Sequence, residues 1–594
     1  MTDNFGPLRV AAFFTFAVLA AWLCAGIARG QAINAQAPIH ISNRYDPTQP
    51  LFTEQQSSVS SQDIHDWLDT AGNKQTWIDV NGILHANSFN TQVFNVKNYG
   101  ATGNALNRTD GAMTSGSAAL ASASSSFAAG DVGKYIVVFG AGAGAAPLVS
   151  TIVAATSSTT VQLASPASTT VSGARFVYGT ADLNAVNAAS TALNAAGGGI
   201  LWFPPGGYIL GNVSTYSNEI VQCAGPGSTI LYSPALGNYS MFDFIGVSNV
   251  GMSGCQLDGQ QVGSAGAGFN FAFRDVTNGW FQNNYTHDGG SDLGVDIDSP
   301  SAPSNHIFIE HNLIAYSHNA IIGTVQTGDG SSDVHFEHNT VLENLSGQLM
   351  FGGDGLQNSL IDGNSFFGTS AVSACIQIEA TSTNVVNVGV HGNLCENVGG
   401  SQAGIFFTET GSNSISNVQS SGNTIVNCLR GESINNFNGS GSGTVKDISI
   451  SNETIIGTTG AAAVYVWNRA GGTFQNISIS DVQIDGCATG DGNGCVILSG
   501  VMTGVSLNGI QVLDVPSGAY GLYETGSPGT VNIGSFSSSG GAGVFNTTTN
   551  LLGNIIAAGT PSGACITGAT YSNTSGAAGS SYYACAAAAW SDVK

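Results

Sequence analysis

The most constraining feature of the sequence is a phrase that recurs from about residue 249 onward. Each copy contains short runs of alternating apolar residues, separated by glycine or asparagine, and closes on an asparagine. The closing residues are Asn284, Asn312, Asn339, Asn364, Asn393, Asn423 and Asn452, with successive spacings of 28, 27, 25, 29, 30 and 29 residues. A repeat of this length is typical of one coil of a parallel β-helix. Because coils stack at about 4.8 Å, the seven asparagines should lie one above another and hydrogen-bond in an interior ladder.

The composition agrees with a chain of many short strands. Period-two alternation, as in the segments FIEH and ISIS, excludes a solenoid of helices. Glycine is abundant, with 81 residues, and only 8% of the residues are charged, which is unlike a helical protein. The sequence therefore predicts an all-β fold, a single-stranded parallel β-helix.

Two segments ahead of the repeat carry a family resemblance. They are VFNVKNYGATGN at 93–104 and TADLNAVNAASTALNAAGGGILWFPPGGYIL at 180–210. They resemble the two halves of the N-terminal signature of pectate-lyase-like and rhamnogalacturonase-like proteins. The resemblance implies a right-handed β-helix of the pectate-lyase-like superfamily and an activity on polysaccharides. Within the second segment, Asp182 is expected to cap a helix that ends near Ala196 and covers the open end of the β-helix.

The remaining segments divide the chain into modules. Arg9 and the apolar run that follows it predict a signal peptide over 1–37, with an uncleaved membrane anchor as the alternative. The other predicted parts are an N-terminal extension with β-hairpin segments (38–92), the β-helix (93–548) with a small β-insert (112–178), and a Cys-closed C-terminal module (549–594). Residues 64–90 resemble the β-hairpins of fibre proteins, which implies a homotrimer. The mature chain is expected to be extracellular or periplasmic, without a membrane segment.

Charge and cysteine content limit the partners and the compartment. The chain has 13 Lys and Arg against 37 Asp and Glu, a net charge of −24. Such a surface repels nucleic acid, and it repels a uronate polymer unless a divalent cation intervenes. Ten cysteines include Cys24 in the signal segment, so at least one of the remaining nine should be unpaired. Local spacing favours the pairs Cys565 with Cys585 and Cys487 with Cys495.

The third strand of each coil should present an exposed sheet along which a glycan can bind. If Val295 and Ile297 point inward, Asp296 and Asp298 point outward, because alternate strand residues face opposite sides. The same register predicts further outward residues: Arg274, Thr324, Gln377, Glu379, Phe406, Thr408, Tyr465 and Trp467. A row of acids followed by aromatic residues is what a sugar-binding groove requires.

Asp296 and Asp298 are the predicted catalytic pair. Two residues apart on one strand, they should lie about 6.6 Å apart, at the lower edge of the separation in inverting glycosidases. Arg274 in the preceding coil should favour the ionised form of Asp298, whereas Ala272 and Ile322 around Asp296 should favour its protonated form. This division makes Asp296 the general acid and Asp298 the base. The alternative is that both carboxylates are solvated or bind Ca²⁺.

Other residues complete the predicted site. Glu379 lies three coils from Asp298, roughly 14 Å away, and is expected to serve another subsite. Asp354 on an intervening strand and His318, just before a groove strand, are additional catalytic candidates. Arg274, Gln377 and Phe406 are predicted to contact substrate, as are Tyr465 and Trp467, whose rings can stack on sugars.

Three functions are compatible with this pattern. The first is an extracellular glycoside hydrolase acting on a plant or microbial cell-wall glycan, with no required cofactor. The second is a Ca²⁺-dependent uronate lyase or epimerase. The third is a non-catalytic glycan-binding or fibre-like protein.

Overall fold

The computed structural model describes most of the chain from residue 92 onward. The described residues are 65–68, 74–78, 84–86, 92–233, 241–260, 270–289, 295–298, 302–317, 323–327, 330–343, 349–436, 443–469, 471–526, 529–546, 551–557, 562–563, 569–573, 581–586 and 589–593. The chain divides into two units, Met1–Asn90 and Thr91–Lys594. In the first unit, β1 (His65–Leu68), β2 (Lys74–Ile78) and β3 (Leu84–Ala86) form an antiparallel sheet. The predicted signal segment 1–37 lies outside the described residues.

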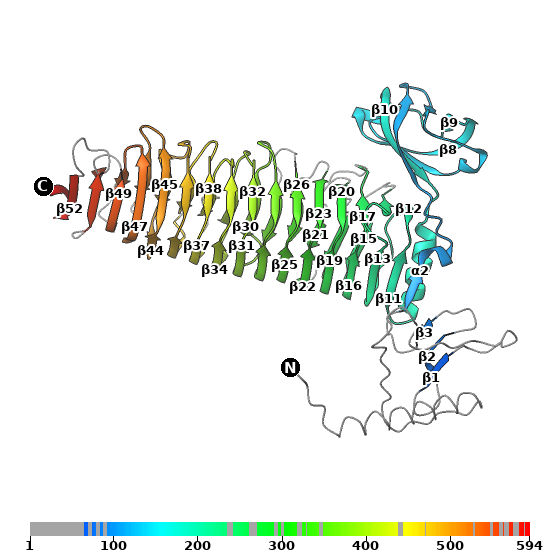
Figure 1. Cartoon of the computed structure of the whole chain (residues 1–594), viewed down its shortest axis with the longest axis horizontal. Coiled ribbons are helices and arrows are strands. Elements are labelled where there is room, and N and C mark those ends of the chain that lie inside the picture. The colour runs from blue at the N-terminus through cyan, green and yellow to red at the C-terminus, as the bar shows by residue number, and fades with distance from the viewer. Residues whose placement is uncertain are drawn as a thin grey trace, which may run out of the picture. The chain divides into compact units, whose positions relative to one another are not determined.

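Within the described part of the second unit, two parallel sheets form the walls of a coiled chain (Figure 1). Sheet 1 has 13 strands: β15 (Phe242–Ile245), β18 (Phe271–Arg274), β21 (Val295–Asp298), β24 (Gly323–Thr327), β27 (Leu349–Asp354), β30 (Ala374–Ala380), β33 (Ile405–Glu409), β36 (Glu432–Asn436), β39 (Val464–Trp467), β42 (Gly494–Ser499), β46 (Tyr520–Thr525), β48 (Val544–Asn546) and β50 (Ser562–Gly563).

Sheet 2 takes up two further strands of each coil, 31 in all within the described residues. They are β4 (Val93–Asn95), β11 (Gly199–Phe203), β12 (Gly206–Ile209), β13 (Glu219–Cys223), β14 (Thr229–Tyr232), β16 (Ser248–Ser253), β17 (Gln256–Asp258), β19 (Thr277–Gln282), β20 (Tyr285–Gly289), β22 (Asn305–Glu310), β23 (Leu313–Ser317), β25 (Ser332–Glu337), β26 (Thr340–Leu342), β28 (Gln357–Asp362), β29 (Ser365–Phe367), β31 (Val385–His391), β32 (Leu394–Glu396), β34 (Ser414–Ser421), β35 (Thr424–Val426), β37 (Thr444–Ser451), β38 (Thr454–Ile456), β40 (Thr473–Ser480), β41 (Gln483–Asp485), β43 (Met502–Thr503), β44 (Val505–Asn508), β45 (Ile510–Val515), β47 (Val531–Gly540), β49 (Leu551–Ala557), β51 (Thr570–Asn573), β52 (Ser581–Ala586) and β53 (Ala589–Val593).

Strand pairing in this unit follows the repeat in the sequence. A coil runs from sheet 1 into two strands of sheet 2 and returns, and its strands pair in parallel with their counterparts in the next coil, as β18 does with β21. The last strands of sheet 2 differ, because β51, β52 and β53 pair antiparallel. Alternate side chains point into the coil, where Phe271, Phe273, Val295 and Ile297 are fully buried in one continuous core. The fold is a right-handed parallel β-helix, as predicted.

A helix covers the first coil. The helix α2 (Leu183–Ala195) buries Val186 and Leu193 against the core and ends before three glycines with positive φ. Asp182 occupies the N-cap position, but its carboxylate makes no bond to the helix. It accepts instead from the backbone N–H groups of Thr102 at 2.6 Å and Gly103 at 3.1 Å. The capping role predicted for Asp182 is therefore wrong, because a neighbouring loop uses its oxygens.

A closed barrel interrupts the N-terminal segment. Its strands are β5 (Leu106–Met113), β6 (Ala119–Ala121), β7 (Tyr135–Val138), β8 (Leu148–Ser157), β9 (Thr160–Leu163) and β10 (Val171–Gly179). Leu120, Ile136 and Phe176 are fully buried in a core of their own. The barrel begins at Leu106, ahead of the expected boundary at 112, because β5 pairs along its length with β10.

The asparagine ladder is present, with one correction at its end. Each ladder amide oxygen accepts the backbone N–H of the equivalent residue in the preceding coil at 2.8–3.0 Å, over Asn284, Asn312, Asn339, Asn364, Asn393 and Asn423. Asn452 is not the next member. Strand register aligns Asn423 with Glu453, while Asn452 sits at a turn position with φ 56°. Asparagine is tolerated at the ladder position and at the turn position before it. The prediction from the motif was therefore wrong by one residue at the last coil.

Glu453 ends the ladder as a buried carboxyl group. Its Oε1 accepts from the amide of Asn423 at 2.9 Å and the hydroxyl of Ser420 at 3.2 Å. Glu432, which points inward from β36, is fully buried next to it. Burial raises the pKa of both carboxyl groups, and their mutual repulsion raises that of Glu432 further. This pair is an acidic interior site that the repeat pattern did not predict.

Three disulfides with both cysteines described lie within the β-helix. The structure contains Cys223–Cys255, Cys375–Cys395 and the predicted Cys487–Cys495. Cys585 on β52 is also disulfide-bonded, whereas its predicted partner Cys565 lies outside the described residues. Cys428 is unpaired and buried. Among the described residues, no helix has the length and apolar character needed to cross a membrane.

Candidate functional site

The outward face of sheet 1 presents two rows of residues, one above another along the coils. Register row 1 contains Asp243, Ala272, Asp296, Gln326, Gly352, Gln377, Phe406, Ser433, Tyr465, Ile497 and Tyr523. Register row 2 contains Ile245, Arg274 and Asp298, then Asp354, Glu379, Thr408, Asn435, Trp467 and Ser499. With one exception, Thr324, every predicted groove residue on the described strands stands in one of these rows.

The predicted catalytic pair lies at one end of the rows. Strand β21 pairs with β18 so that Asp296 is aligned with Ala272 and Asp298 with Arg274, as expected. On the other side the prediction is wrong, because Gln326 of β24, not Ile322, is aligned with Asp296. An amide neighbour favours protonation of a carboxyl less than an apolar one does. The side chains of Asp296 and Asp298 lie outside the described residues, so their separation and roles stay predictions, as does the role of His318.

Arg274 has a carboxylate partner that sequence reasoning missed. Its Nε donates to Oδ1 of Asp243 at 2.9 Å, and a second guanidinium nitrogen contacts Oδ2 of the same residue. Asp243 lies on β15 and is 9% exposed. The alternation in FDFI at 242–245 is the signal that could have added this strand to the groove. Arg274 is therefore paired with a carboxylate of the preceding coil as well as being aligned with Asp298 in register.

The structure brings Gln377, Glu379 and Phe406 together around one pocket. This pocket, of about 210 Å³, is lined by Gln377, Glu379, Thr381, Gln402, Phe406, Thr408 and Thr410. The amide nitrogen of Gln377 donates to Glu379 Oε2, and the hydroxyl of Thr381 donates to Glu379 Oε1. Two buried oxygens, Oε1 of Gln377 and Oε1 of Gln402, have no hydrogen-bond partner. The pocket therefore combines the carboxylate of Glu379, fixed by two hydrogen bonds, with two acceptor oxygens that have no donor.

Gln402 was missed because it lies in a loop. It falls between β32 and β33, where strand alternation cannot indicate which way a side chain points. Asp354, by contrast, is next to Glu379 in row 2 but does not line the pocket. Its carboxylate accepts the backbone N–H groups of Thr381 at 2.9 Å and Ser382 at 3.2 Å. These hydrogen bonds stabilise a turn beside the pocket. The catalytic role of Asp354 stays a prediction.

Two aromatic rings continue the rows two coils beyond Phe406. The rings of Tyr465 and Trp467 are stacked, with centroids 5.4 Å apart and an interplanar angle of 16°. The guanidinium of Arg469 lies 5.0 Å from the centre of the Trp467 ring. Tyr465 is only 8% exposed, because its neighbours in the row cover it, whereas Trp467 is half-buried. Trp467 therefore offers the more accessible surface for sugar stacking.

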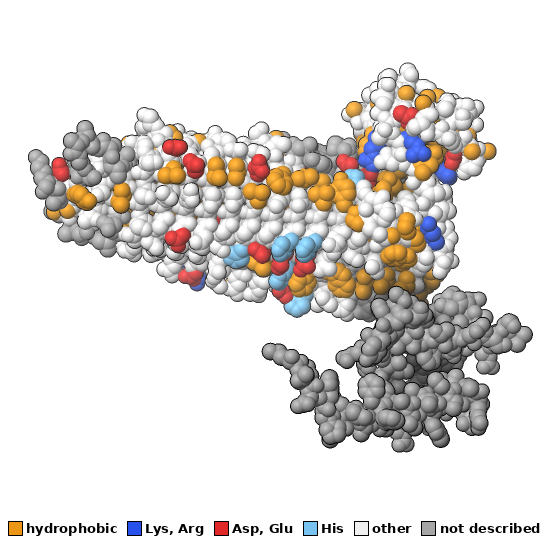
Figure 2. Space-filling view, in the orientation of Figure 1, with side chains coloured by type: hydrophobic (Ala, Val, Ile, Leu, Met, Phe, Trp, Pro, Cys, Tyr) orange, Lys and Arg blue, Asp and Glu red, His pale blue; other side chains and the backbone are white. Residues whose placement is uncertain are grey.

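The described histidines of the second unit lie on sheet 2 strands or in the turns between them, away from these rows. Figure 2 shows histidine side chains beside acidic ones midway along the visible face. The ring of His335 lies 2.6 Å from Glu337 and 3.0 Å from Asp333, which also pairs with His306. Although burial favours the neutral ring, the hydrogen bonds to Glu337 and Asp333 raise the pKa of His335. Both ring nitrogens of His335 therefore have acidic partners within the protein, as does Nδ1 of His306.

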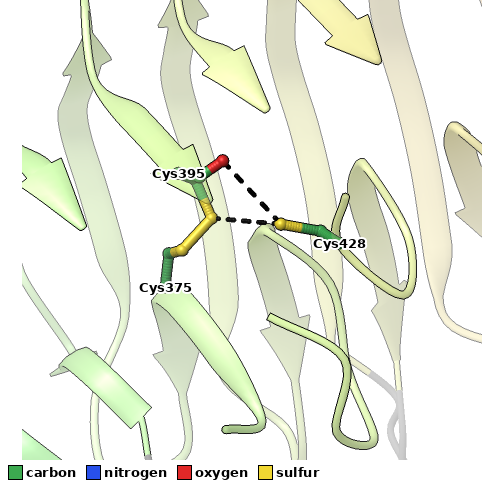
Figure 3. Close-up of side chains that lie close together, drawn as sticks. All are labelled: Cys375, Cys395 and Cys428. Atoms are coloured by element: carbon green, nitrogen blue, oxygen red, sulfur yellow. Dashed lines mark hydrogen bonds between the residues drawn. A yellow bond between two sulfur atoms is a disulfide. The ribbon is translucent and has the colours of Figure 1, made fainter. Parts of the chain in front are cut away.

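Two groups among the described residues have the residue types and spacing of metal ligands. One consists of Cys375, Cys395 and Cys428 (Figure 3), but the first two form a disulfide and cannot both act as thiolates.

The other metal-ligand group consists of Asp258, His287 and Asp288. There Arg175 forms ion pairs with both aspartates, and Asp288 also contacts the His287 ring at 2.9 Å. Burial raises the pKa of Asp258, against the effects of His287 and Arg175. Each side chain of this group therefore already has a partner within the protein.

Comparison with known proteins gives similarity of structure only. No family model matches the sequence, and no curated protein matches it. The structure is similar to the A-module of the Azotobacter vinelandii mannuronan C-5 epimerase AlgE4, with 15% identity over 65% of this chain and 96% of that one and a TM-score of 0.37. A GH87 alpha-1,3-glucanase catalytic unit from Streptomyces thermodiastaticus gives 13% identity, 78% and 88% coverage and a TM-score of 0.36. Gene product 12 of bacteriophage phi29, in its pre-mature form, is 14% identical over 66% of this chain and 71% of that one, with a TM-score of 0.36.

Proposed function

We propose that this chain is a secreted polysaccharide-active enzyme, a glycoside hydrolase that binds its glycan along the outward face of sheet 1. The observation that carries the proposal is the pocket around Gln377 and Glu379, which lies in the same rows as the stacked rings of Tyr465 and Trp467. Phe406 and Tyr465 are two coils apart, which corresponds to roughly 10 Å. A polar pocket followed by aromatic surfaces suits successive sugar units of one chain.

In this proposal the chemistry occurs at Asp296 and Asp298. Asp296, as general acid, protonates the oxygen of the scissile glycosidic bond while that bond breaks. Asp298, as general base, takes a proton from the water that attacks the anomeric carbon, which inverts its configuration. Glu379, about 14 Å away, is too distant to react with the same bond and binds sugar instead.

The disulfides support export of the chain. Disulfides such as Cys223–Cys255 and Cys375–Cys395 persist in oxidising compartments, which agrees with removal of residues 1–37 as a signal peptide. Homotrimerisation through residues 64–90 remains part of the proposal. The N-terminal sequence of the exported protein and its mass by light scattering test these two points.

The activity is tested by incubating the purified chain with a panel of neutral and acidic polysaccharides, with Ca²⁺ and with EDTA. A hydrolase releases reducing ends without ultraviolet-absorbing products. Asp296→Asn and Asp298→Asn should each lower the rate by at least a hundredfold. Asp485→Asn, which changes an exposed acid on sheet 2, is the matched control and should leave the rate unchanged.

The other outcomes separate the alternatives. EDTA-sensitive release of unsaturated products that absorb in the ultraviolet identifies a Ca²⁺-dependent lyase. Binding without release of reducing ends identifies a non-catalytic glycan-binding protein. Full activity in both aspartate variants would show that the catalytic residues are assigned wrongly.

A further inference from the structure

The pocket around Glu379 contains two buried acceptors that the protein leaves open. Gln377 is 8% exposed, and its Oε1 has no hydrogen-bond partner. Oε1 of Gln402, which lines the same pocket, is also buried without a partner. A buried acceptor without a donor costs about 1–3 kcal/mol. A ligand that brings donors to these two oxygens recovers that cost.

The contacts of Glu379 determine which atom of the Gln377 amide is open. An ionised carboxylate accepts hydrogen bonds only, and Glu379 Oε2 receives one from the amide nitrogen of Gln377. The reversed amide would place its oxygen against the carboxylate and repel it. The group left for a ligand is therefore an acceptor, and the ligand must supply a donor such as a hydroxyl.

The charges around the pocket disfavour an anionic ligand. Its lining contains the carboxylate of Glu379 and neither lysine nor arginine. Arg430 contacts the backbone carbonyl of Gln402, but Asp491 binds its guanidinium through two oxygens, at 2.5 and 2.6 Å. A uronate would thus meet a negative charge without a compensating cation.

Phe406 adds an apolar surface to this polar lining. Phe406 is 4% exposed and lines the pocket beside Thr408. A pyranose has hydroxyl donors at its edge and C–H groups on its faces, and both kinds of surface find a counterpart here.

We infer that the pocket binds an uncharged sugar unit, whose hydroxyl groups donate to Oε1 of Gln377 and Oε1 of Gln402, and that Glu379 excludes uronates. This inference rests on the proposed function and names the substrate class of its groove as a neutral glycan. It makes Gln377 and Glu379 specificity-determining residues.

The test measures binding to the full chain by isothermal titration calorimetry. The neutral probes are cellohexaose, maltohexaose and laminarihexaose, and the acidic probes are hexagalacturonate and hexamannuronate. We expect at least one neutral probe to bind and the acidic probes to bind at least tenfold more weakly. Gln377→Met and Gln402→Met, which keep the side-chain length but remove the amide, should each weaken neutral binding about tenfold or more. Gln402→Met is the cleaner test, because Gln377→Met also removes the hydrogen bond to Glu379.

Two further variants sharpen the result. Glu379→Gln should raise uronate affinity while changing neutral affinity by only a few fold. Gln419→Met removes an exposed glutamine from sheet 2 and should change nothing. Circular dichroism confirms that each variant is folded.

The inference is overturned if no neutral probe binds, if Gln377→Met and Gln402→Met leave neutral binding intact, or if Gln377→Met weakens uronate binding. Reducing-end release is measured separately on the neutral polysaccharides. Gln377-dependent binding without cleavage would reject the hydrolase but keep the neutral pocket. Cleavage at an unchanged rate in both Gln377→Met and Gln402→Met would keep the hydrolase but reject the neutral pocket.

Discussion

Replacing one ladder asparagine should weaken the β-helix far more than replacing a surface asparagine. The side chain of Asn364 is 1% exposed and takes part in four hydrogen bonds. Its amide donates to the carbonyl of Phe336 at 2.7 Å and to Oδ1 of Asn393 at 2.9 Å. Its oxygen accepts the backbone N–H of Asn339 at 2.8 Å and the side-chain amide of Asn339 at 3.1 Å. Asn364→Ala removes all four.

The cost is set by the groups that lose their partners. The side-chain amide of Asn339 keeps the carbonyl of Ile309 at 2.7 Å, and Oδ1 of Asn393 keeps the backbone N–H of residue 364 at 3.0 Å. The buried backbone N–H of Asn339 loses its acceptor, which costs about 1–3 kcal/mol. The other three losses add about 0.5–1.5 kcal/mol each, so the total is roughly 2.5–7.5 kcal/mol.

Hydrogen exchange measures this loss where it occurs. Because a solenoid can open locally, the exchange rate of the backbone N–H of Asn339 measures the loss of stability better than a global unfolding transition does. A local loss of about 3 kcal/mol corresponds to roughly a hundredfold faster exchange. The control is Asn387→Gly, which removes two exposed hydrogen bonds, one donated to Asn358 at 2.7 Å and one accepted from Asn417 at 2.6 Å. Glycine also suits the backbone φ of 57° at that position.

Equal exchange rates and equal thermal midpoints in Asn364→Ala and Asn387→Gly would refute the reasoning. That result would mean that the interior of the coil admits water, which could replace the lost acceptor.

Three further predictions follow from single side chains. Burial raises the pKa of Glu524 from 4.5 to about 8, so the carboxyl supports folding fully below pH 4.5 and loses that support progressively up to about pH 8. The gain in thermal midpoint from Glu524→Gln should therefore grow between pH 5 and 8 and then level off; a gain independent of pH would contradict this. Burial raises the pKa of Cys428 to about 11, so maleimide should label its peptide in denaturant but not in the folded protein at pH 7.5, as mass spectrometry can show. Trp467→Ala should weaken glycan binding about three- to tenfold, whereas Trp280→Ala on sheet 2 should not; equal effects would argue against a groove on sheet 1.

The coil architecture was predictable because its signals are local and repeated. Alternation within VDID correctly placed Val295 and Ile297 in the core, and coil spacing correctly aligned Arg274 with Asp298. Each of these predictions needs only the period of the strand and the length of one coil. The same two quantities brought Gln377 and Glu379 onto one face, where the structure forms a pocket.

The failures occur where a position accepts more than one residue type or where a loop changes length. Asparagine is suited both to the ladder and to the turn position beside it. The sequence therefore could not show that Asn452 lies in the turn and that Glu453 occupies the ladder position. Gln326 replaced Ile322 as the neighbour of Asp296 because the segment between β21 and β24 is longer than the alignment assumed. Gln402 lies in a loop that has no periodicity.

The disulfide Cys223–Cys255 indicates how cysteines in such a chain should be paired. Its residues are 32 positions apart, about one coil, whereas the sequence favoured pairs with short loops. Cys255 occupies the ladder position directly before Asn284 and donates its backbone N–H to that residue's amide oxygen at 2.9 Å. In a solenoid, residues one period apart are neighbours in space, so coil register brings together cysteines that are distant in the sequence. Coil spacing alone does not decide the pairing, however, because Cys395 and Cys428 are 33 positions apart, yet Cys395 is bonded to Cys375 and Cys428 is free.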